Sequence, residues 1–510
     1  MTKVAVFLSL CFVAVKLGLA QNYDDNRAKV LIIGGGAAGL QAAKEFHDQG
    51  MDDLIIIEAA DFFGGRVHDV TFAGVQVEAG ANWAQPPGTE IIDWVKRLSI
   101  QYHESDFDSV IIRNETGHDV SEEADPIWED MEHALERLEE IGSELNEECR
   151  KDMSLRAALR LAGWKPTTPI HKSIEFFDFD FEWADIPAVT SLKSTTPIQT
   201  ISATGGNLFV TDQGGFKRIF EEITPWLMMD AYKNHLRLNK TVVSVTDKSS
   251  NGVEVRCADG TVYTGDHALV TVSLGVLQND VIDFQPALPD WKIVKFFQFI
   301  MASFAKVFIK FPNQFWDDDE WIMYASERRG YFPAFSNLNA PGLFPAGTNI
   351  LVGFVTGDEA RRIQNQPLAE TKAEVEAVMR KMYPDATVPE ATDIYVTDWD
   401  TNPLHYGAYS NWPVEISTEG FEQIQSRVGN IFFAGEHTDP MFNGYIIGAT
   451  RSGIREAEKI MACMNGEECP AYEPPESYSC PAETTGNGNI ITLSFIGICL
   501  TATLHAFIAL

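Results

Sequence analysis

Basic residues are scarce in this 510-residue chain. It has 39 Lys and Arg against 73 Asp and Glu, a formal net charge of −34 at pH 7. Such a charge repels nucleic acid and anionic membranes, so we expect neither as a partner, and it attracts small cations toward an acidic cleft. The length predicts two or more domains. With 45% hydrophobic and 22% charged residues, the chain is globular rather than disordered.

Cysteines are also few, and their spacing excludes the usual zinc patterns, so we predict no metal site. Two of the seven lie in hydrophobic terminal segments, and the other five are an odd number, so at least one has no intrachain partner. The last three cluster, as expected of a local disulfide in a secreted protein. The terminal pair is Cys11 and Cys499, and the others are Cys149, Cys257, Cys463, Cys469 and Cys480.

Long hydrophobic runs occur only near the two ends. Residues 1–20 carry a basic residue, an apolar run and small residues, which predicts a secretory signal peptide. Residues 466–489 form a polar spacer, and 490–510 form an apolar tail without basic residues after it. This pattern favours a glycolipid (GPI) anchor signal, and an uncleaved tail-anchoring helix is the alternative. We expect an extracellular, cell-surface protein that contacts membrane only there.

Sequons at Asn114 and Asn239 agree with secretion and predict a glycoprotein. The chain has no internal repeats, and the polar spacer is its one compositionally biased segment.

Glycines gather near the N-terminus in KVLIIGGGAAG, residues 29–39. The apolar run 30–33 predicts a buried parallel strand, after which Gly34, Gly36 and Gly39 match G-x-G-x-x-G. A helical pattern and a second strand follow, and that strand ends at Glu58. The glycines permit a tight turn, approach to a pyrophosphate and close helix packing, and the acid suits a ribose hydroxyl. The sequence therefore predicts a dinucleotide site.

Two further glycine segments favour a flavin over a nicotinamide nucleotide. Gly64, Gly65 and Arg66 follow the ribose acid closely, where a nicotinamide enzyme has no evident need for them. Near the C-terminal side, an apolar strand closes on Gly435 and Glu436, and a glycine-opened helix begins near Gly444. That helix can direct a second dipole end toward a flavin ring.

Lysine interrupts an otherwise apolar predicted strand in ASFAKVFIKFPNQFW, residues 302–316. Period two places Phe304, Lys306 and Phe308 on one face. An edge strand with a snorkelling lysine is one interpretation, and a lysine held in a dry pocket for chemistry is the other. Residues 126–151 predict an amphipathic helix whose many acids we expect to face solvent.

Taken together, GGGAAG, Glu58, FFGGR, GANW, LGVLQ, AKVFIKFP, YSNWP, FFAGEHT and NGYIIGA resemble the flavin-dependent amine oxidases. Within that family, the chain most resembles the secreted polyamine oxidases of plants. The resemblance covers about residues 29–463. It implies an α/β fold in which a Rossmann-like FAD-binding domain is assembled from separated segments, beside an α+β substrate domain with a mixed sheet. The implied FAD-binding segments are 28–105, 240–290 and 410–465, and the implied substrate-binding segments are 106–239 and 291–409.

The same resemblance implies oxidation of a polyamine such as spermine, spermidine or an acetylated derivative. Hydride would pass to flavin N5, the product imine would hydrolyse to an aldehyde and a shorter amine, and oxygen would become hydrogen peroxide. Lys306 would reach N5 through a water, and Tyr409 and Tyr445 would form aromatic walls for the amine. The implied cofactor-binding residues are Gly34, Gly36, Ala38, Gly39, Glu58, Gly65, Arg66, Trp83, Val242, Glu436, Gly444 and Tyr445.

Three implied substrate-binding positions are Glu182, Gln85 and Phe304. Glu182 matches an acid of the plant substrate tunnel, whereas Gln85 stands where those enzymes have a second acid and Phe304 where they have a tyrosine. These departures leave open which amine is used and which bond is cleaved. The alternatives are an L-amino-acid or other amine oxidase, and a flavin-bearing surface protein with little oxidase activity.

Overall fold

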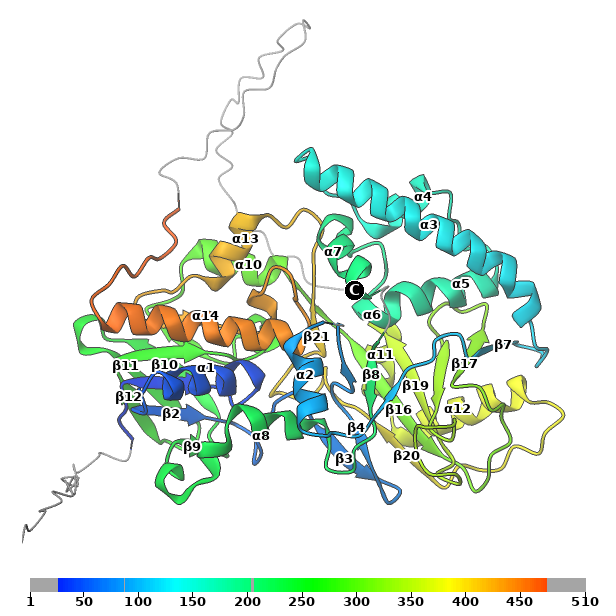
Figure 1. The fold of residues 1–510 in the computed structure, drawn as a ribbon, viewed down its shortest axis with the longest axis horizontal. Coiled ribbons are helices and arrows are strands. Elements are labelled where there is room, and N and C mark those ends of the chain that lie inside the picture. The colour runs from blue at the N-terminus through cyan, green and yellow to red at the C-terminus, as the bar shows by residue number, and fades with distance from the viewer. Residues whose placement is uncertain (1–25, 87, 203–205, 475–510) are drawn as a thin grey trace, which may run out of the picture. The chain divides into compact units, whose positions relative to one another are not determined.

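The computed structural model describes residues 26–86, 88–202 and 206–474, and Figure 1 shows their arrangement. The predicted signal peptide, the apolar tail, most of the polar spacer and Cys480 lie outside the described residues. The longer helices are α1 (Ala37–Asp48), α2 (Glu90–Arg97), α3 (Ser121–Glu147), α4 (Leu155–Leu161), α5 (Pro169–Glu175), α7 (Leu192–Ser202), α10 (Asp290–Gln298), α11 (Gly357–Gln364), α12 (Leu368–Met382), α13 (Thr418–Gln425) and α14 (Ile446–Met464). Shorter helices are α6 (Phe181–Trp183), α8 (Ile219–Ile223) and α9 (Leu274–Gln278), with a π-helical turn η1 (Phe176–Asp180).

A five-stranded parallel sheet has the order β22-β13-β1-β2-β9. Its strands are β1 (Val30–Ile33), β2 (Leu54–Ile57), β9 (Leu236–Arg237), β13 (His267–Val270) and β22 (Ile431–Phe433). They come from distant parts of the chain. Strands β1, β2 and β22 are continuous buried apolar runs, as parallel strands are, and β13 is one after its half-buried first residue, His267. Helices α1 and α14, from opposite ends of the described chain, pack together beside this sheet (Figure 1).

A six-stranded sheet has the order β20-β16-β19-β18-β17-β7 and is mixed, since β17 and β7 pair in parallel and the other pairs are antiparallel. Its strands are β7 (Val110–Asn114), β16 (Phe304–Lys310), β17 (Trp321–Ala325), β18 (Ala334–Asn337), β19 (Ile350–Thr356) and β20 (Asp393–Val396). The predicted fold class, a discontinuous Rossmann-like domain plus a substrate domain with a mixed sheet, is confirmed.

Strand β16 lies between β20 and β19, so it is not an edge strand. Its Ala305, Val307 and Ile309 pack in one core with residues of α12, such as Val375 and Met379. The alternation of strand side chains then sends Phe304, Lys306 and Phe308 to the opposite face. The period-two prediction for this strand is therefore correct, and the edge-strand interpretation of Lys306 is excluded.

The described residues form four smaller sheets. One has four strands in the order β12-β11-β10-β14, one has three in the order β5-β8-β6, and two are pairs, β3-β4 and β15-β21. The strands are β3 (Asp69–Phe72), β4 (Val75–Glu78), β5 (Trp83–Ala84), β6 (Tyr102–Glu104), β8 (Leu208–Val210), β10 (Val242–Asp247), β11 (Val253–Cys257), β12 (Val262–Gly265), β14 (Asp283–Gln285), β15 (Ile300–Ala302) and β21 (Tyr409–Asn411).

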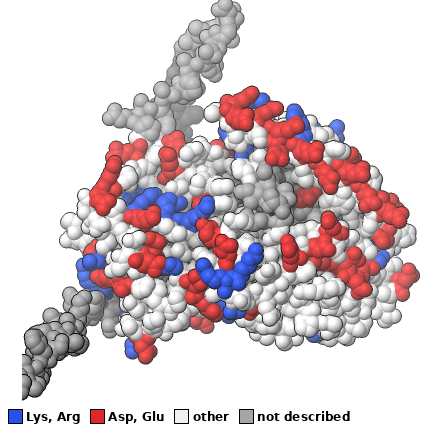
Figure 2. All heavy atoms as spheres, in the orientation of Figure 1, with Lys and Arg blue, Asp and Glu red and all other residues white. Residues whose placement is uncertain are grey.

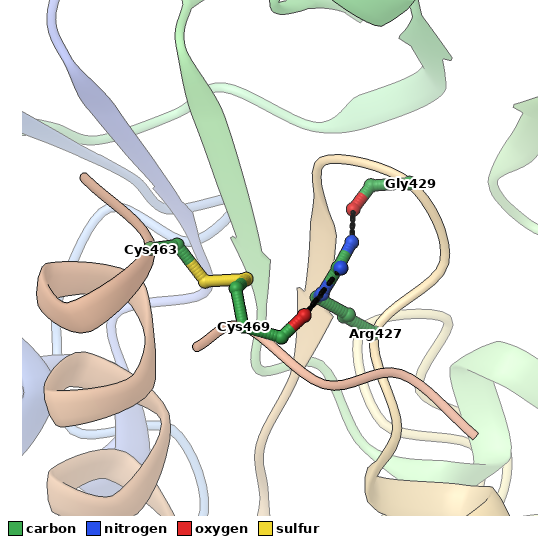
Figure 3. Close-up of a disulfide and its surroundings, with 4 residues drawn as sticks. All are labelled: Arg427, Gly429, Cys463 and Cys469. Atoms are coloured by element: carbon green, nitrogen blue, oxygen red, sulfur yellow. Dashed lines mark hydrogen bonds between the residues drawn. A yellow bond between two sulfur atoms is a disulfide. The ribbon is translucent and has the colours of Figure 1, made fainter. Parts of the chain in front are cut away.

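A disulfide joins Cys463, near the end of α14, to Cys469 (Figure 3). Beside it, the Arg427 guanidinium donates to the carbonyl oxygens of Cys469 and Gly429. Cys149 is exposed and Cys257 is buried, both as free thiols. The local disulfide expected near the C-terminal side is therefore present. Among residues 26–474 as described, no helix has the length and apolar character needed to cross a membrane.

Candidate active site

One large cavity, of about 1190 Å³, is lined both by the glycine loops of the parallel sheet and by the mixed sheet. It gathers nearly every site residue that the sequence predicts. Gly39 is the exception, since it lies behind the lining and packs against β1. The predicted residues that line the cavity are Gly34, Gly36, Ala38, Glu58, Gly65, Arg66, Trp83, Gln85, Glu182, Val242, Phe304, Lys306, Tyr409, Glu436, Gly444 and Tyr445.

The first glycine loop has the shape that a pyrophosphate requires. Gly34 has φ +112°, and a Cβ there would lie 2.6 Å from Thr271 Oγ1, so only glycine suits the turn. A Cβ on Gly39 would overlap the Gly34 carbonyl oxygen. At Gly36, by contrast, the nearest atom to a Cβ is Gly65 Cα at 4.0 Å, so a side chain would project into the cavity. The two glycine loops thus form a cradle that fits a dinucleotide at the start of α1.

Glu58 stands at the carboxyl end of β2 and is nearly buried. Its carboxylate accepts hydrogen bonds from the backbone N–H groups of Gly35 (2.6 Å) and Ala60 (2.7 Å). Burial raises its pKa, and those backbone donors oppose the rise. The carboxylate also lines the cavity, so it is placed to meet a ribose hydroxyl as well as to hold the glycine loop.

Arg66 and Glu436 join the two flavin-type segments that the sequence singles out. The Arg66 guanidinium donates to Glu436 Oε1 at 2.9 Å and to the Ala408 carbonyl oxygen at 2.9 Å. Glu436 also accepts hydrogen bonds from Ser410 and from the Gly444 N–H at 2.8 Å. Burial alone would raise the Glu436 pKa, but the charge of Arg66 and the other donors lower it. Glu436 is therefore a buried carboxylate that organises the cavity wall.

Lys306 is 4% exposed, and its ammonium lies beside the cavity. It donates to the carbonyl oxygens of Glu78 (2.9 Å) and Gly80 (2.6 Å) and to Asn82 Oδ1. Burial lowers its pKa to about 7, opposed by the charge of Glu78. The three acceptors favour the ammonium while burial favours the neutral amine, so the proton on this nitrogen is poised for transfer near neutral pH.

The hydroxyl groups of Tyr409 and Tyr445 both form hydrogen bonds with Glu182. The Tyr409 hydroxyl donates to the Glu182 carbonyl oxygen at 3.0 Å, and the Tyr445 hydroxyl donates to Glu182 Oε1. Burial raises the Glu182 pKa, opposed by the bond from Tyr445, and burial also raises the pKa values of both tyrosines. Two aromatic rings and a carboxyl group therefore face the same space, which suits an alkylamine.

Further aromatic rings make the surroundings apolar. Phe304 lies 6.1 Å from the Tyr409 ring and 6.0 Å from the Phe181 ring, measured between centroids. Trp83 packs against Phe181 at 5.7 Å, and its Nε1 donates to Ser105 Oγ at 3.0 Å. These rings exclude water from the cavity wall next to Lys306.

One arm of the cavity is strongly acidic. Helix α3 contributes Asp125, Glu132, Glu136 and Glu139, spaced so that they share a face with Trp128, Met131 and Leu135. These acids are exposed, as the sequence predicts, but they also line the cavity, which it did not predict. Figure 2 shows acidic side chains crowded along α3.

Sequence reasoning missed several residues that complete the site. Asn82 binds Lys306 and precedes the predicted Trp83, and Asp178 lines the cavity one turn before the predicted Glu182. The i, i+4 spacing from Glu182 was the available signal for Asp178. Thr271 closes on Gly34 from the carboxyl end of β13, and no local pattern pointed to it.

Comparison with known proteins agrees with this geometry. The family model for flavin containing amine oxidoreductase matches residues 37–461. Polyamine oxidase 6 of Oryza sativa subsp. japonica is 36% identical over 92% of this chain and 97% of its own length. Polyamine oxidase 1 of Zea mays is 37% identical over 86% of this chain and 92% of its own length.

Solved structures support the fold. A putrescine oxidase, wild type bound to putrescine, superposes with a TM-score of 0.69 at 19% identity and covers 86% of this chain and 99% of that one. The fold and the cradle define a flavoprotein oxidoreductase. More particularly, the chain belongs to the flavin-containing amine oxidoreductases, with FAD as cofactor and an amine and oxygen as reactants. The family resemblance noted in the sequence is confirmed.

Proposed function

We propose that this protein oxidises polyamines with FAD and oxygen, giving an aldehyde, a shorter amine and hydrogen peroxide. The observation that carries the proposal is the convergence of Tyr409 and Tyr445 on Glu182, in the cavity that also contains the glycine cradle and Lys306. The plant relatives at 36–37% identity bear the name polyamine oxidase, which supports the same assignment.

The chemistry that FAD supplies when bound is acceptance of a hydride from the carbon beside the amine nitrogen. The chain's own residues orient and desolvate the amine. Tyr409 and Tyr445 hold its alkyl part, and Glu182 attracts its nitrogen. Lys306 holds or releases a proton at Nζ, because burial brings its pKa near the working pH.

The acidic arm supports a substrate with more than one positive charge. Four carboxylates of α3 line it, and the whole chain carries a net charge of −34. Negative potential focused in a cleft raises the local concentration of cations and the rate at which they arrive. A neutral or singly charged amine would gain little from this arrangement.

A second candidate, L-amino-acid oxidation, needs an arginine to grip the substrate carboxylate. Among the described residues that line the cavity, the arginine present is Arg66, and its guanidinium is already bonded to Glu436 and to the Ala408 carbonyl. The site therefore favours a polyamine.

A peroxide assay on the purified flavoprotein tests the proposal. Spermine, spermidine, their N-acetylated forms, simple monoamines and several L-amino acids are compared at equal concentrations. We expect peroxide from polyamines and little from L-amino acids. Peroxide mainly from L-amino acids would support the second candidate. No peroxide from any substrate, with flavin bound, would reject both and leave a surface protein with little oxidase activity.

We also propose that the protein passes through the secretory pathway and is held at the cell surface by a lipid anchor. The apolar segment within residues 1–20, the polar spacer before the apolar tail, and a disulfide typical of oxidising compartments support this. Of the two sequon asparagines, Asn239 is the more exposed and the better glycosylation candidate. Release of activity from intact cells by a phosphatidylinositol-specific phospholipase is expected. Retention after that treatment would favour a tail-anchoring helix.

A further inference from the structure

A short helical segment, η1 followed by α6, carries two carboxylates into the cavity. Asp178 lies in η1 and Glu182 in α6, and both line the cavity. They are four positions apart, so one lies about a helical turn beyond the other along the same face. Glu182 meets Tyr409 and Tyr445, whereas Asp178 lies close enough to Glu132 of α3 for the charge of Glu132 to act on it.

Asp178 differs from the other acids of its segment. Its Oδ2 atom is buried and has no hydrogen-bond donor among the residues that the structure describes. By contrast, Glu175 is paired with Arg156 and Arg329, and Asp180 with Arg329. The two carboxylates of this segment that line the cavity, Asp178 and Glu182, therefore have no arginine or lysine paired with them among the described residues, whereas Glu175 and Asp180, which do not line it, are paired with arginine.

A buried carboxylate without a cation costs folding free energy unless a bound ligand compensates its charge. Burial, together with the nearby negative charges of Glu132 and Glu175, raises the Asp178 pKa to about 7. Buried polar atoms are almost always satisfied, and an exception calls for a specific explanation. A cationic ligand entering the cavity would supply the compensating charge.

The spacing of the two carboxylates suits an amine with two nitrogens. Four positions of an α-helix correspond to about 6 Å along its axis, and the wider π-helical turn η1, which holds Asp178, shortens this rise. Two nitrogens joined by three or four methylenes lie about 5–6 Å apart when the chain is extended, as ordinary bond lengths require. The Phe177 and Trp128 rings, which also line this part of the cavity, would pack against the methylenes.

We infer that Asp178, with Glu132 beside it, binds a second protonated nitrogen of the substrate while the reacting amine lies against Tyr409 and Tyr445. This inference rests on the proposed amine oxidation and adds to it a residue that selects for diamines and longer polyamines over monoamines. Asp178 is a specificity residue, and the reacting carbon does not touch it.

The test compares N-alkyl diamines, in which a secondary nitrogen lies three to eight carbons from a primary one, with secondary monoamines of the same length, using the flavin-bound enzyme and spermidine as the positive control. Asp178→Asn keeps the shape of the side chain and removes its charge. We expect the ratio of kcat/KM for a diamine over its matched monoamine to fall by about tenfold or more, the usual scale for one charge-assisted hydrogen bond. The fall is expected mainly in KM for the diamine.

Two further variants distinguish a direct contact of Asp178 with the substrate from a general effect of negative charge on the kcat/KM ratio. Glu129→Gln removes a charge from the same helix at an exposed position that does not line the cavity, and it should leave the ratio unchanged. Glu132→Gln changes an exposed side chain and therefore does not threaten folding, and it should lower the ratio by a smaller factor than Asp178→Asn. If Asp178→Asn fails to fold, the result for Glu132→Gln decides.

The outcomes are distinct. A wild-type enzyme that oxidises diamines while Asp178→Asn and Glu132→Gln keep the wild-type ratio would overturn the inference and leave the proposed function standing. An equal fall in Glu129→Gln would also overturn it, since general charge would then explain the selectivity. A flavin-bound wild type that oxidises no amine would reject the proposed function itself.

Discussion

Lys306 shows what a single residue contributes and how far the sequence predicts it. The alternation of side chains along β16 correctly places it on the face opposite Ala305 and Val307. Its three acceptors come from the separate chain segment 78–82, which reaches it only in the folded protein. The strand and the face were therefore predictable, whereas the hydrogen bonds that hold the ammonium were not.

Replacing Lys306 by methionine removes the proton-carrying nitrogen and keeps the length of the side chain. We expect turnover to slow by about 10²-fold or more, the usual scale for losing a group that transfers protons. Bound flavin, measured by its visible absorbance, should remain. Lys310→Met is the matched control, because Lys310 lies on the same strand face but bonds to the Thr348 carbonyl oxygen. Unchanged turnover in Lys306→Met would show that the site is misplaced.

The buried carboxyl group of Glu78 should make the stability of the folded protein depend on pH. Glu78 pairs across β3 and β4 with Asp69, which forms an ion pair with the Lys217 ammonium at 2.9 Å, whereas Glu78 Oε2 is buried without a hydrogen-bond donor among the described residues. Burial raises the Glu78 pKa to about 8. The folded protein therefore keeps a proton that the unfolded chain loses above about pH 4.5. The resulting stability is present at low pH and is lost as the pH rises toward 8.

Glu78→Gln should remove this loss. The wild type is expected to lose up to about 1 kcal/mol of folding free energy per pH unit between pH 5 and 6 from this group, and the variant should not. Unfolding midpoints of the flavin-bound proteins in urea at the two pH values measure the difference. The pKa of Lys306 is lowered to about 7, so this group is still mostly protonated at pH 6 and contributes little to the slope over this range. Parallel pH dependence in the two proteins would contradict the assignment.

At the scale of elements, the segment α5–η1–α6 is held in place by buried ion pairs. Arg329 bonds to Asp180 at 2.6 and 2.7 Å and to Glu175 at 2.7 Å, and Arg156 also pairs with Glu175. These contacts fix the segment that carries Asp178 and Glu182 into the cavity. The geometry of the site therefore depends on an arginine that does not line it.

Arg329→Leu would leave Glu175 and Asp180 short of a counter-charge. Both carboxylates are buried, so we expect the variant to lose about 3–5 kcal/mol of folding free energy. Arg328→Leu, at the neighbouring exposed position, should cost no more than about 1 kcal/mol. Urea unfolding followed by tryptophan fluorescence compares the two. Similar losses in both variants would mean that the buried pairs do not hold the segment.

Helix α3 shows where local patterns fail at this scale. The sequence predicts a helix over 126–151, with Pro126 at its start, but the helix spans Ser121–Glu147. The Val120 N–H donates to the Ile112 carbonyl oxygen and Ala124 is buried, so contacts with β7 set the N-terminal end. The amphipathic period was read correctly from the sequence. The acids of α3 line a cavity because of how this helix packs against the rest of the protein. The spacing of apolar residues in the sequence does not reveal that packing.

For the whole molecule, the sequence predicts the fold better than it predicts which amine the enzyme prefers. The glycine loops, strand runs and separated segments indicate the fold because each obeys a local rule. Gln85 and Phe304 depart from the plant pattern, and their effect depends on the combined shape of the cavity. The net charge of −34, read from composition alone, acts at this scale through attraction of cations.

Ionic strength should therefore affect substrates according to their charge. Raising NaCl from about 20 to 500 mM shortens the screening length severalfold. We expect kcat/KM to fall by about tenfold for a tetra-amine and by less than about twofold for a monoamine. Equal osmolarity of sucrose serves as the control. An equal fall for both amines would show that long-range attraction does not contribute to selectivity.

The parallel sheet takes its edge strand β22 from residues 431–433, and α14 packs on α1 from the other end of the described chain. Translation makes the glycine cradle long before the strand and helix that complete it. A nascent chain consequently lacks Glu436 and the support of α14 until translation has passed Met464, the last residue of that helix. Cofactor loading is thus a late event in biogenesis, and a premature stop anywhere before residue 430 should yield a chain that cannot retain its flavin.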